Sequence, residues 1–223
     1  MIAEGLVTVA GAVADKPARL VSVADAIVVQ GPARPYVSRG GEKLVAGLDG
    51  FGITVDGLRV LDAGASTGGF TDCVLQRGAQ RVIAVDVGYG QLHERLRGDE
   101  RVDLRERTNI RTLDADAIGG PVDLVVADLS FISLRTVAAA LLACAAPGAD
   151  LVLLVKPQFE AGRAEASRGR GVIRDPDVRA RVLEEVSGAL TELGAAIMGT
   201  MESPLKGADG NVEFLLHARK GEG

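Results

Sequence analysis

The sequence is poor in aromatic residues, cysteine and histidine. Aromatic residues make up 3% of the 223 positions, and tryptophan is absent. Cys73 and Cys144 are isolated and form no C-x-x-C motif, which predicts two buried thiols in a reducing cytoplasm. His93 and His217 are too few and too far apart in the chain to indicate a metal site. We therefore expect no metal centre.

The sequence also lacks a long uninterrupted hydrophobic run. The longest apolar stretch, residues 136–155, contains Pro147, Gly148 and Asp150, so it is unsuited to cross a bilayer as one helix. No signal-peptide pattern of basic residues followed by apolar ones precedes it. We therefore expect a cytoplasmic protein without a membrane partner.

A strong excess of basic residues is missing as well. The net charge of −5 argues against a strongly basic nucleic-acid-binding protein, although basic residues can still gather locally. Two stretches contain several basic residues, and acidic residues interleave with the second one, so solvated loops are an alternative interpretation there. The residues that we expect to contact a polyanionic partner are Arg34, Arg39, Arg163, Arg168 and Arg170.

The first 30 residues differ in character from the rest of the chain. They contain two strand-like runs, residues 5–9 and 26–29, and they are too few to bury much of a core. Two prolines then disfavour a helix, after which Ser38 is a candidate N-cap for a helix over residues 40–51. We therefore divide the chain into a segment 1–31, a linker 32–37 and a main domain 38–223.

From residue 57 onward, strand-like runs alternate with helical patterns. The runs are rich in Val, Ile and Leu with little alternation, which is typical of parallel strands covered on both faces. This order predicts an α/β domain, a mostly parallel sheet flanked by helices. We expect strands at 59–62, 81–86, 101–106, 122–128, 150–156, 196–202 and 212–218, and helices at 69–78, 90–97, 114–118, 134–145 and 176–193.

Residues 60–70 are expected to form the ligand-binding turn of this domain. An apolar run ends in Asp62, and a loop of glycine and small residues then leads into a helical pattern. The dinucleotide fingerprint fits poorly, because Ser66 stands at its second glycine position. Asp62 would repel a pyrophosphate but attract a sulfonium cation such as S-adenosylmethionine, and Asp86 can accept ribose hydroxyls at the next strand end. On these residues alone, an ordinary turn with a capping aspartate is an equal alternative.

Four further charged residues are candidates for chemistry. Asp128 and Lys156 end two predicted strands, Glu213 opens the last one, and Lys43 lies on the helix before the sheet. A lysine at the tip of an apolar strand is costly unless it is paired or used. Lys156 could therefore take a proton from a hydroxyl, or hold that hydroxyl in line with a methyl carbon. For each residue alone a structural salt bridge is favoured; their joint placement favours a site.

Six segments, in order, resemble the TlyA family, also called hemolysin A. Members are S-adenosylmethionine-dependent ribosomal RNA ribose 2′-O-methyltransferases related to the FtsJ type. The resemblance implies a Rossmann-like fold with a seven-stranded sheet whose last strand is antiparallel. It also implies methylation of cytidine ribose in 16S and, in many members, 23S ribosomal RNA, with ribosomal RNA and ribosomal subunits as partners. The segments are residues 38–44, 61–71, 85–92, 127–133, 155–160 and 210–214, and the resemblance covers essentially the whole chain.

The same resemblance implies roles for particular residues. The family's catalytic Lys-Asp-Lys-Glu tetrad falls on Lys43, Asp128, Lys156 and Glu213. The residues that would bind S-adenosyl-L-methionine are Asp62, Gly64, Ser66, Thr67, Gly68, Gly69, Asp86, Val87, Thr108, Asn109 and Asp128.

The N-terminal segment departs from the family pattern. Family members usually begin with a complete S4-type RNA-binding domain, in which two helices precede small strands. Residues 1–31 resemble only the second half of that domain. Two interpretations follow: the true start lies upstream of Met1, or this is a truncated S4-like segment. For the sequence as given we expect weakened RNA affinity, because phosphate contacts carry most of that affinity.

The sequence leaves other functions as alternatives to this one. A non-catalytic RNA-binding or ribosome-assembly factor predicts a degraded tetrad or cofactor loop, and both are complete here. A membrane-active hemolysin needs an amphipathic or membrane-spanning segment, and we find none in the sequence. A methyltransferase acting on another substrate is the remaining alternative, and a nicotinamide dehydrogenase is disfavoured by Ser66.

Overall fold

A computed structural model describes residues 2, 5–30, 35–162, 165, 169, 171–207 and 209–222. The chain divides into two compact units, residues 1–35 and 36–223. Each unit is described below by itself. Within the described part of the chain, no helix has the length and apolar character needed to traverse a bilayer.

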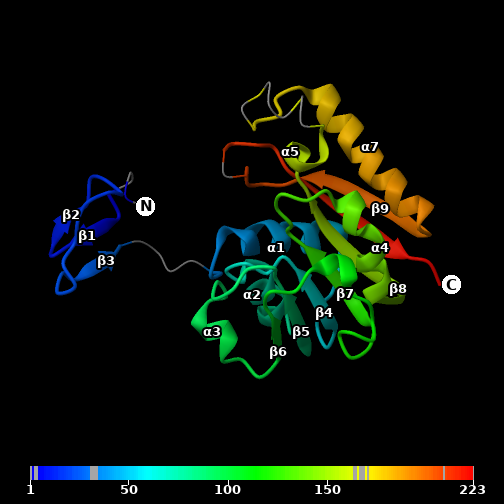
Figure 1. Ribbon diagram of the computed structural model, residues 1–223, viewed down its shortest axis with the longest axis horizontal. Coiled ribbons are helices and arrows are strands. Elements are labelled where there is room, and N and C mark those ends of the chain that lie inside the picture. Colours follow the sequence, from blue (N-terminus) through cyan, green and yellow to red (C-terminus); the bar gives the residue numbers. More distant parts are fainter. Residues whose placement is uncertain are drawn as a thin grey trace. The chain divides into compact units, whose positions relative to one another are not determined.

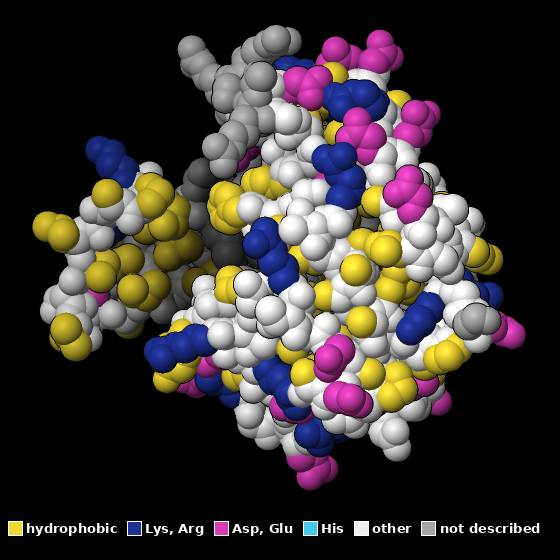
Figure 2. Space-filling view, turned by 45° about the vertical axis from the view of Figure 1, so that its right-hand side comes forward, with side chains coloured by type: hydrophobic (Ala, Val, Ile, Leu, Met, Phe, Trp, Pro, Cys, Tyr) yellow, Lys and Arg dark blue, Asp and Glu magenta, His cyan; other side chains and the backbone are white. Residues whose placement is uncertain are grey.

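The first unit is a small antiparallel sheet of order β2-β1-β3. Strand β1 (Val7–Val9) pairs with β2 (Ala12–Val13) and with β3 (Ile27–Val29). Its core is small: among the residues described in this unit, the buried hydrophobic ones are Val7, Val9 and Ala14, while all three residues of β3 are exposed. Hydrophobic side chains are accordingly visible on the surface of this unit (Figure 2). The expected β-rich segment is confirmed.

The second unit contains a seven-stranded sheet of order β6-β5-β4-β7-β8-β10-β9 (Figure 1). The first five strands along the chain are parallel, and β10 runs antiparallel between β8 and β9. The predicted methyltransferase-type sheet with an antiparallel last strand is therefore confirmed. The strands are β4 (Arg59–Ala63), β5 (Arg81–Val85), β6 (Val102–Arg105), β7 (Val122–Ala127), β8 (Ala145–Val155), β9 (Ala195–Glu202) and β10 (Phe214–Lys220).

Helices cover both faces of this sheet (Figure 1). Successive strand residues point to opposite faces: Val60 packs with one helical layer and Leu61 with the other, and Val152 and Leu153 repeat this pattern. Both faces are buried, which explains the continuous apolar runs in the sequence. One layer contains α1 (Arg39–Phe51), α2 (Gly69–Gln76) and α3 (Glu94–Arg97); the other contains α4 (Leu134–Cys144) and α7 (Pro176–Glu192).

Several local expectations are confirmed. The Ser38 side chain accepts the Gly40 N–H at 3.3 Å and so caps α1. Pro176 occupies the first turn of α7, where its missing N–H costs nothing. Cys73 and Cys144 are both free and buried.

Two helix predictions were wrong or too long. Asp114 has no regular structure, residues 115–118 form turns, and a short 3-10 helix, η1 (Ile110–Thr112), precedes them. Gly119 and Gly120 follow with φ of +78° and +119°, so too few residues remain to offset the cost of starting a helix. In the predicted helix 90–97, only the α3 residues are helical.

Candidate active site

The candidate site lies at the carboxyl ends of the parallel strands. Two cavities of about 250 and 510 Å³ open there, and both are lined by the loop after β4 and the residues after β7. Strand β10 starts at this edge, because Phe214 pairs with Val155, the last residue of β8. A crevice outside the carboxyl ends of the strands is where open α/β sheets bind ligands.

The loop after β4 depends on two close backbone approaches. Gly64 has φ +85°, and a Cβ at this position would lie 2.7 Å from the Asp128 carbonyl oxygen. At Gly69, a Cβ would lie 2.2 Å from Ser38 Oγ. The absence of these two side chains lets the loop sit against the end of β7 and the start of α1. Gly64, Ser66, Thr67 and Gly69 line the smaller cavity, and Gly68 caps the start of α2.

Asp86 joins the loop to the larger cavity. Its Oδ2 accepts the Ser66 N–H at 2.8 Å, and its Oδ1 accepts the Gly88 N–H at 2.7 Å. A carboxylate has about four acceptor positions, so Asp86 can still accept two hydroxyl groups. The larger cavity is also lined by Val87, Thr108 and Asn109, as well as by Gly64, Ser66 and Asp128.

Asp62 is fully buried and lines neither cavity. Thr71 donates its hydroxyl hydrogen to Asp62 Oδ2 at 2.6 Å, whereas Oδ1 has no hydrogen-bond partner among the described residues. Burial raises the pKa of Asp62 to about 7; the Thr71 hydrogen bond opposes this shift, and the negative charges of Asp128 and Asp86 add to it. Asp62 therefore lies beneath the loop and does not face either cavity. With a pKa of about 7, its carboxyl group is close to the point between its neutral and its negatively charged form at neutral pH.

The four candidate catalytic residues form two ion pairs. Lys43 Nζ on α1 lies 2.5 Å from Glu213 Oε2, just before β10. Lys156 Nζ, after β8, lies 2.6 Å from Asp128 Oδ1 and donates to Ser130 Oγ at 2.9 Å. Lys43, Asp128 and Lys156 line the smaller cavity, with Glu213 behind Lys43. Residues distant in the chain thus meet at one cavity.

Some lining residues were not singled out from the sequence. Ser130 and Phe131 follow Asp128, and the ring of the exposed Phe131 lies 5.1 Å from that of Phe159. Their position next to Asp128 was the available signal. Lys206, in the loop before β10, also lines the smaller cavity, and nothing in its local sequence marks it.

Of the five arginines expected to contact RNA, Arg39 lines the smaller cavity, and its Nη2 donates to the Lys206 carbonyl at 3.0 Å. Basic and acidic side chains are interspersed on the face seen in Figure 2. The other four, Arg34, Arg163, Arg168 and Arg170, lie outside the described residues.

Comparisons with known proteins show the family to which this chain belongs. The FtsJ-like methyltransferase family profile matches residues 36–220. The chain is 54% identical to the 16S/23S rRNA (cytidine-2′-O)-methyltransferase TlyA of Mycobacterium tuberculosis, over 98% of this chain and 82% of that protein. It is 42% identical to Hemolysin A of Brachyspira hyodysenteriae, over 82% and 76%.

Solved structures of other proteins are similar to this chain in fold. A protein of Streptococcus thermophilus described as a hemolysin matches with a TM-score of 0.87 and 40% identity, covering 99% of this chain and 81% of that one. The N-methyltransferase NodS of Bradyrhizobium japonicum, with a TM-score of 0.56 and 19% identity over 82% and 95%, shares the fold. The chain therefore belongs to the FtsJ-like methyltransferase family, within its TlyA group.

Proposed function

We propose that this protein transfers the methyl group of S-adenosylmethionine to the ribose 2′-hydroxyl of a cytidine in 16S, and also 23S, ribosomal RNA. The observation that carries the proposal is that two ion pairs, Lys43–Glu213 and Lys156–Asp128, lie beside the same cavity. The named activity of the 54% identical relative supports the substrate. We place the reaction in the cytoplasm, with ribosomal subunits as partners.

The larger cavity fits an adenosyl group. Asp86 would accept the ribose hydroxyls, and Thr108 and Asn109 would lie beside the adenine; Val87 contributes an apolar wall. The tight loop from Gly64 to Gly69 would hold the methionyl part, with the buried Asp62 compensating the positive charge of the sulfonium. When bound, S-adenosylmethionine supplies an electrophilic methyl carbon.

The lysines supply positioning and a proton acceptor. Asp128 and Ser130 hold Lys156 Nζ in place. Once this ammonium has lost a proton to Asp128 or to solvent, the neutral amine orients a ribose hydroxyl and takes its proton as the oxygen is methylated. The Lys43–Glu213 pair adds a second ordered ammonium close by. Arg39, on the rim, would contact an RNA phosphate.

Methyl transfer with labelled cofactor and ribosomal RNA or subunits tests this proposal. We expect label in 2′-O-methylcytidine, and label on a base or on no RNA would overturn it. Lys156→Ala should keep its affinity for S-adenosylmethionine and lose transfer. Lys220→Ala, at the far end of β10, is a matched lysine control that should retain transfer; unchanged turnover in Lys156→Ala would return Lys156 to a structural role.

We also propose that residues 1–31 form an S4-like RNA-binding segment, joined by residues 32–37 to a methyltransferase domain of residues 38–223. Its separate three-stranded sheet supports this division. Replacing its exposed basic residues Lys16 and Arg19 by alanine should weaken RNA binding and lower its salt dependence. Affinity for S-adenosylmethionine should stay the same; unaltered RNA binding would contradict the proposal.

A further inference from the structure

Two loops that follow neighbouring parallel strands are joined by three successive contacts. One loop, residues 128–133, follows β7, and the other, residues 156–160, follows β8 and contains the short helix α5 (Pro157–Glu160). At the cavity, Lys156 Nζ donates a hydrogen bond to Ser130 Oγ at 2.9 Å. Next along the loops, the ring centroids of Phe159 and Phe131 lie 5.1 Å apart. In the third contact, Ser133 Oγ donates a hydrogen bond to Glu160 Oε2 at 2.5 Å. The first of these contacts belongs to the candidate catalytic lysine.

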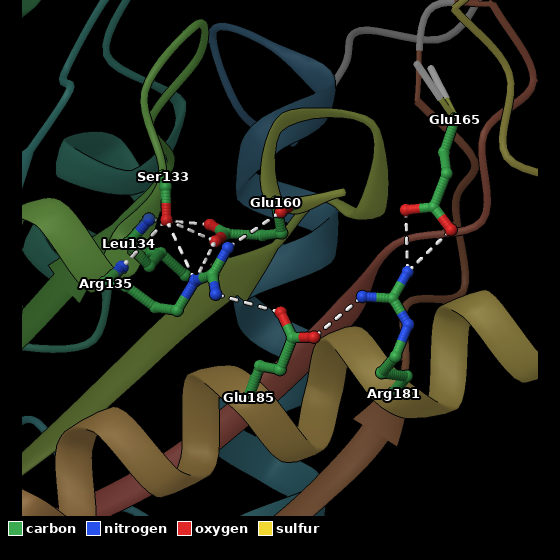
Figure 3. A network of polar contacts seen from close by, with 7 residues as sticks. All are labelled: Ser133, Leu134, Arg135, Glu160, Glu165, Arg181 and Glu185. Carbon is green, nitrogen blue, oxygen red and sulfur yellow. Dashed lines mark hydrogen bonds and ion pairs between the residues drawn. The ribbon is translucent and has the colours of Figure 1, made fainter. Parts of the chain in front are cut away.

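Glu160 makes the contact farthest from the cavity, and it is 4% exposed. Ser133 donates its hydroxyl hydrogen to Glu160 Oε2, and the Leu134 N–H donates to Oε1 at 2.6 Å. Figure 3 shows the carboxylate turned toward these two groups at the start of α4. A carboxylate is favourable there because the first N–H groups of a helix lack partners within the helix. Glu160 therefore fixes the point at which the loop enters α4.

An outer chain of charges extends from this contact (Figure 3). Arg135 donates to the Glu160 carbonyl at 2.9 Å and pairs with Glu185, and Arg181 bridges Glu185 and Glu165. These outer side chains are about one third or more exposed, and pairs of exposed charges contribute little because solvent screens them. The buried bonds of Glu160 are thus the part of the network that can hold the loop.

The loop between the two ends needs such a support. Phe131 has φ +65°, a left-handed conformation that residues with a side chain rarely adopt and that persists only where the surroundings impose it. Ser130 is its immediate neighbour, so relaxation at Phe131 would move the Ser130 hydroxyl away from Lys156.

We propose that Glu160 is a positioning residue for methyl transfer: by holding Ser133 and Leu134, it keeps Ser130 hydrogen-bonded to Lys156. The inference rests on the catalytic role proposed for Lys156. A misplacement of about 1 Å at a reacting group can lower a rate on the order of a hundredfold. Loss of this support should therefore lower kcat much more than it changes KM for RNA.

The test is kcat at saturating cofactor and RNA for substitutions of Glu160. Glu160→Ala should lower kcat by about 10- to 100-fold. Glu160→Gln keeps the length and one acceptor oxygen, so it should retain more activity than Glu160→Asp, which keeps the charge but is too short. A role of the charge alone, through Arg135, predicts the reverse order and would overturn the inference. Glu185→Gln, in the outer chain, is the matched control and should keep the wild-type kcat.

A double-mutant cycle separates positioning from general stability. If Glu160 acts through Ser130, adding Glu160→Ala to Ser130→Ala should lower kcat by less than about threefold more. The inference would be overturned if the reduction of kcat in the double variant equalled the product of the reductions in the two single variants. It would also be overturned if Glu160→Ala had the same kcat as the wild-type protein. If Glu160→Ala does not fold, as judged by circular dichroism, Ser133→Ala gives the same cycle from the other side of the contact. Lys156→Ala, assayed in parallel, separates the two proposals: if it keeps turnover, the proposed function of Lys156 fails first.

Discussion

Lys43 and Glu213 are 170 positions apart in the chain, yet Lys43 Nζ lies 2.5 Å from Glu213 Oε2, with 10% and 3% of the side chains exposed. Taking both charges out of water is costly, and the attraction between them offsets this cost only in good geometry. Well-packed apolar residues would hold α1 against the start of β10 at least as well. Retention of a buried ion pair beside the cavity is therefore better explained by chemistry than by stability.

This relationship gives a first prediction that separates stability from activity. Lys43→Ala should lower the free energy of unfolding by about 3–5 kcal/mol, because Glu213 remains buried without its partner. The double variant Lys43→Met, Glu213→Leu should recover most of that loss but have no methyl transfer. Urea unfolding and a transfer assay measure both.

A control for this prediction is the pair of Arg77 and Asp49, which is more exposed than Lys43 and Glu213, with 28% and 64% of the side chains exposed. Asp49→Asn should change the free energy of unfolding by less than about 1 kcal/mol. A double variant as unstable as Lys43→Ala, or one that still methylates RNA, would contradict the account of the buried pair.

A second prediction concerns pH and Asp62. Its pKa is raised from 3.8 to about 7 by burial, so the folded protein holds a proton that the unfolded chain releases. The contribution of Asp62 to stability therefore falls as pH rises from about 4 to about 7 and is constant above that range. Asp62→Asn should remove this dependence on pH. The unfolding free energy of the variant minus that of the wild-type protein should therefore increase by on the order of 4 kcal/mol as pH rises across this range. Denaturant unfolding at a series of pH values measures the difference, and a constant difference would rule out the raised pKa.

A third prediction concerns the close approach at Gly64. Gly64→Ala places a Cβ 2.7 Å from the Asp128 carbonyl oxygen at φ +85°, so it should displace the end of β7 and weaken cofactor binding by about tenfold or more. Gly57→Ala is the matched control, since its φ is +75° but nothing lies within 4 Å. It should cost only backbone strain, about 1–2 kcal/mol of stability. Calorimetry with S-adenosylmethionine distinguishes the variants, and equal affinities would show that the contact is unimportant.

A fourth prediction concerns Asp86. Asp86→Asn retains one acceptor oxygen and replaces the other with a donor group, so it cannot accept from Ser66, Gly88 and two ribose hydroxyls. Cofactor affinity should fall by about 10- to 100-fold, through hydrogen bonds to a charged acceptor. Glu106→Gln, whose carboxylate accepts the nearby Gly90 N–H at 2.7 Å outside both cavities, is the control and should bind the cofactor normally. Equal affinities would place the ribose elsewhere.

The sheet could be predicted because its signals are local. Residues 82–85 form an apolar run without alternation, and such a run is compatible with few positions other than a buried parallel strand. The failure at residues 114–118 has the opposite cause. Helical propensity over five residues is weak, and the turn that closes against Gly119 and Gly120 depends on the packing of the chain around it.

The sequence by itself determined which charged residues come directly after a strand. Asp86 and Lys156 follow apolar runs, and the ends of parallel strands share one edge of the sheet. Only the tertiary structure decided which of these charges pair, that Asp62 lies behind its loop and not in a cavity, and that Glu160 holds the loop containing Ser130. The physical reason is that strand direction follows from short-range patterns, whereas hydrogen bonds between loops depend on shifts of about an ångström set by the whole core.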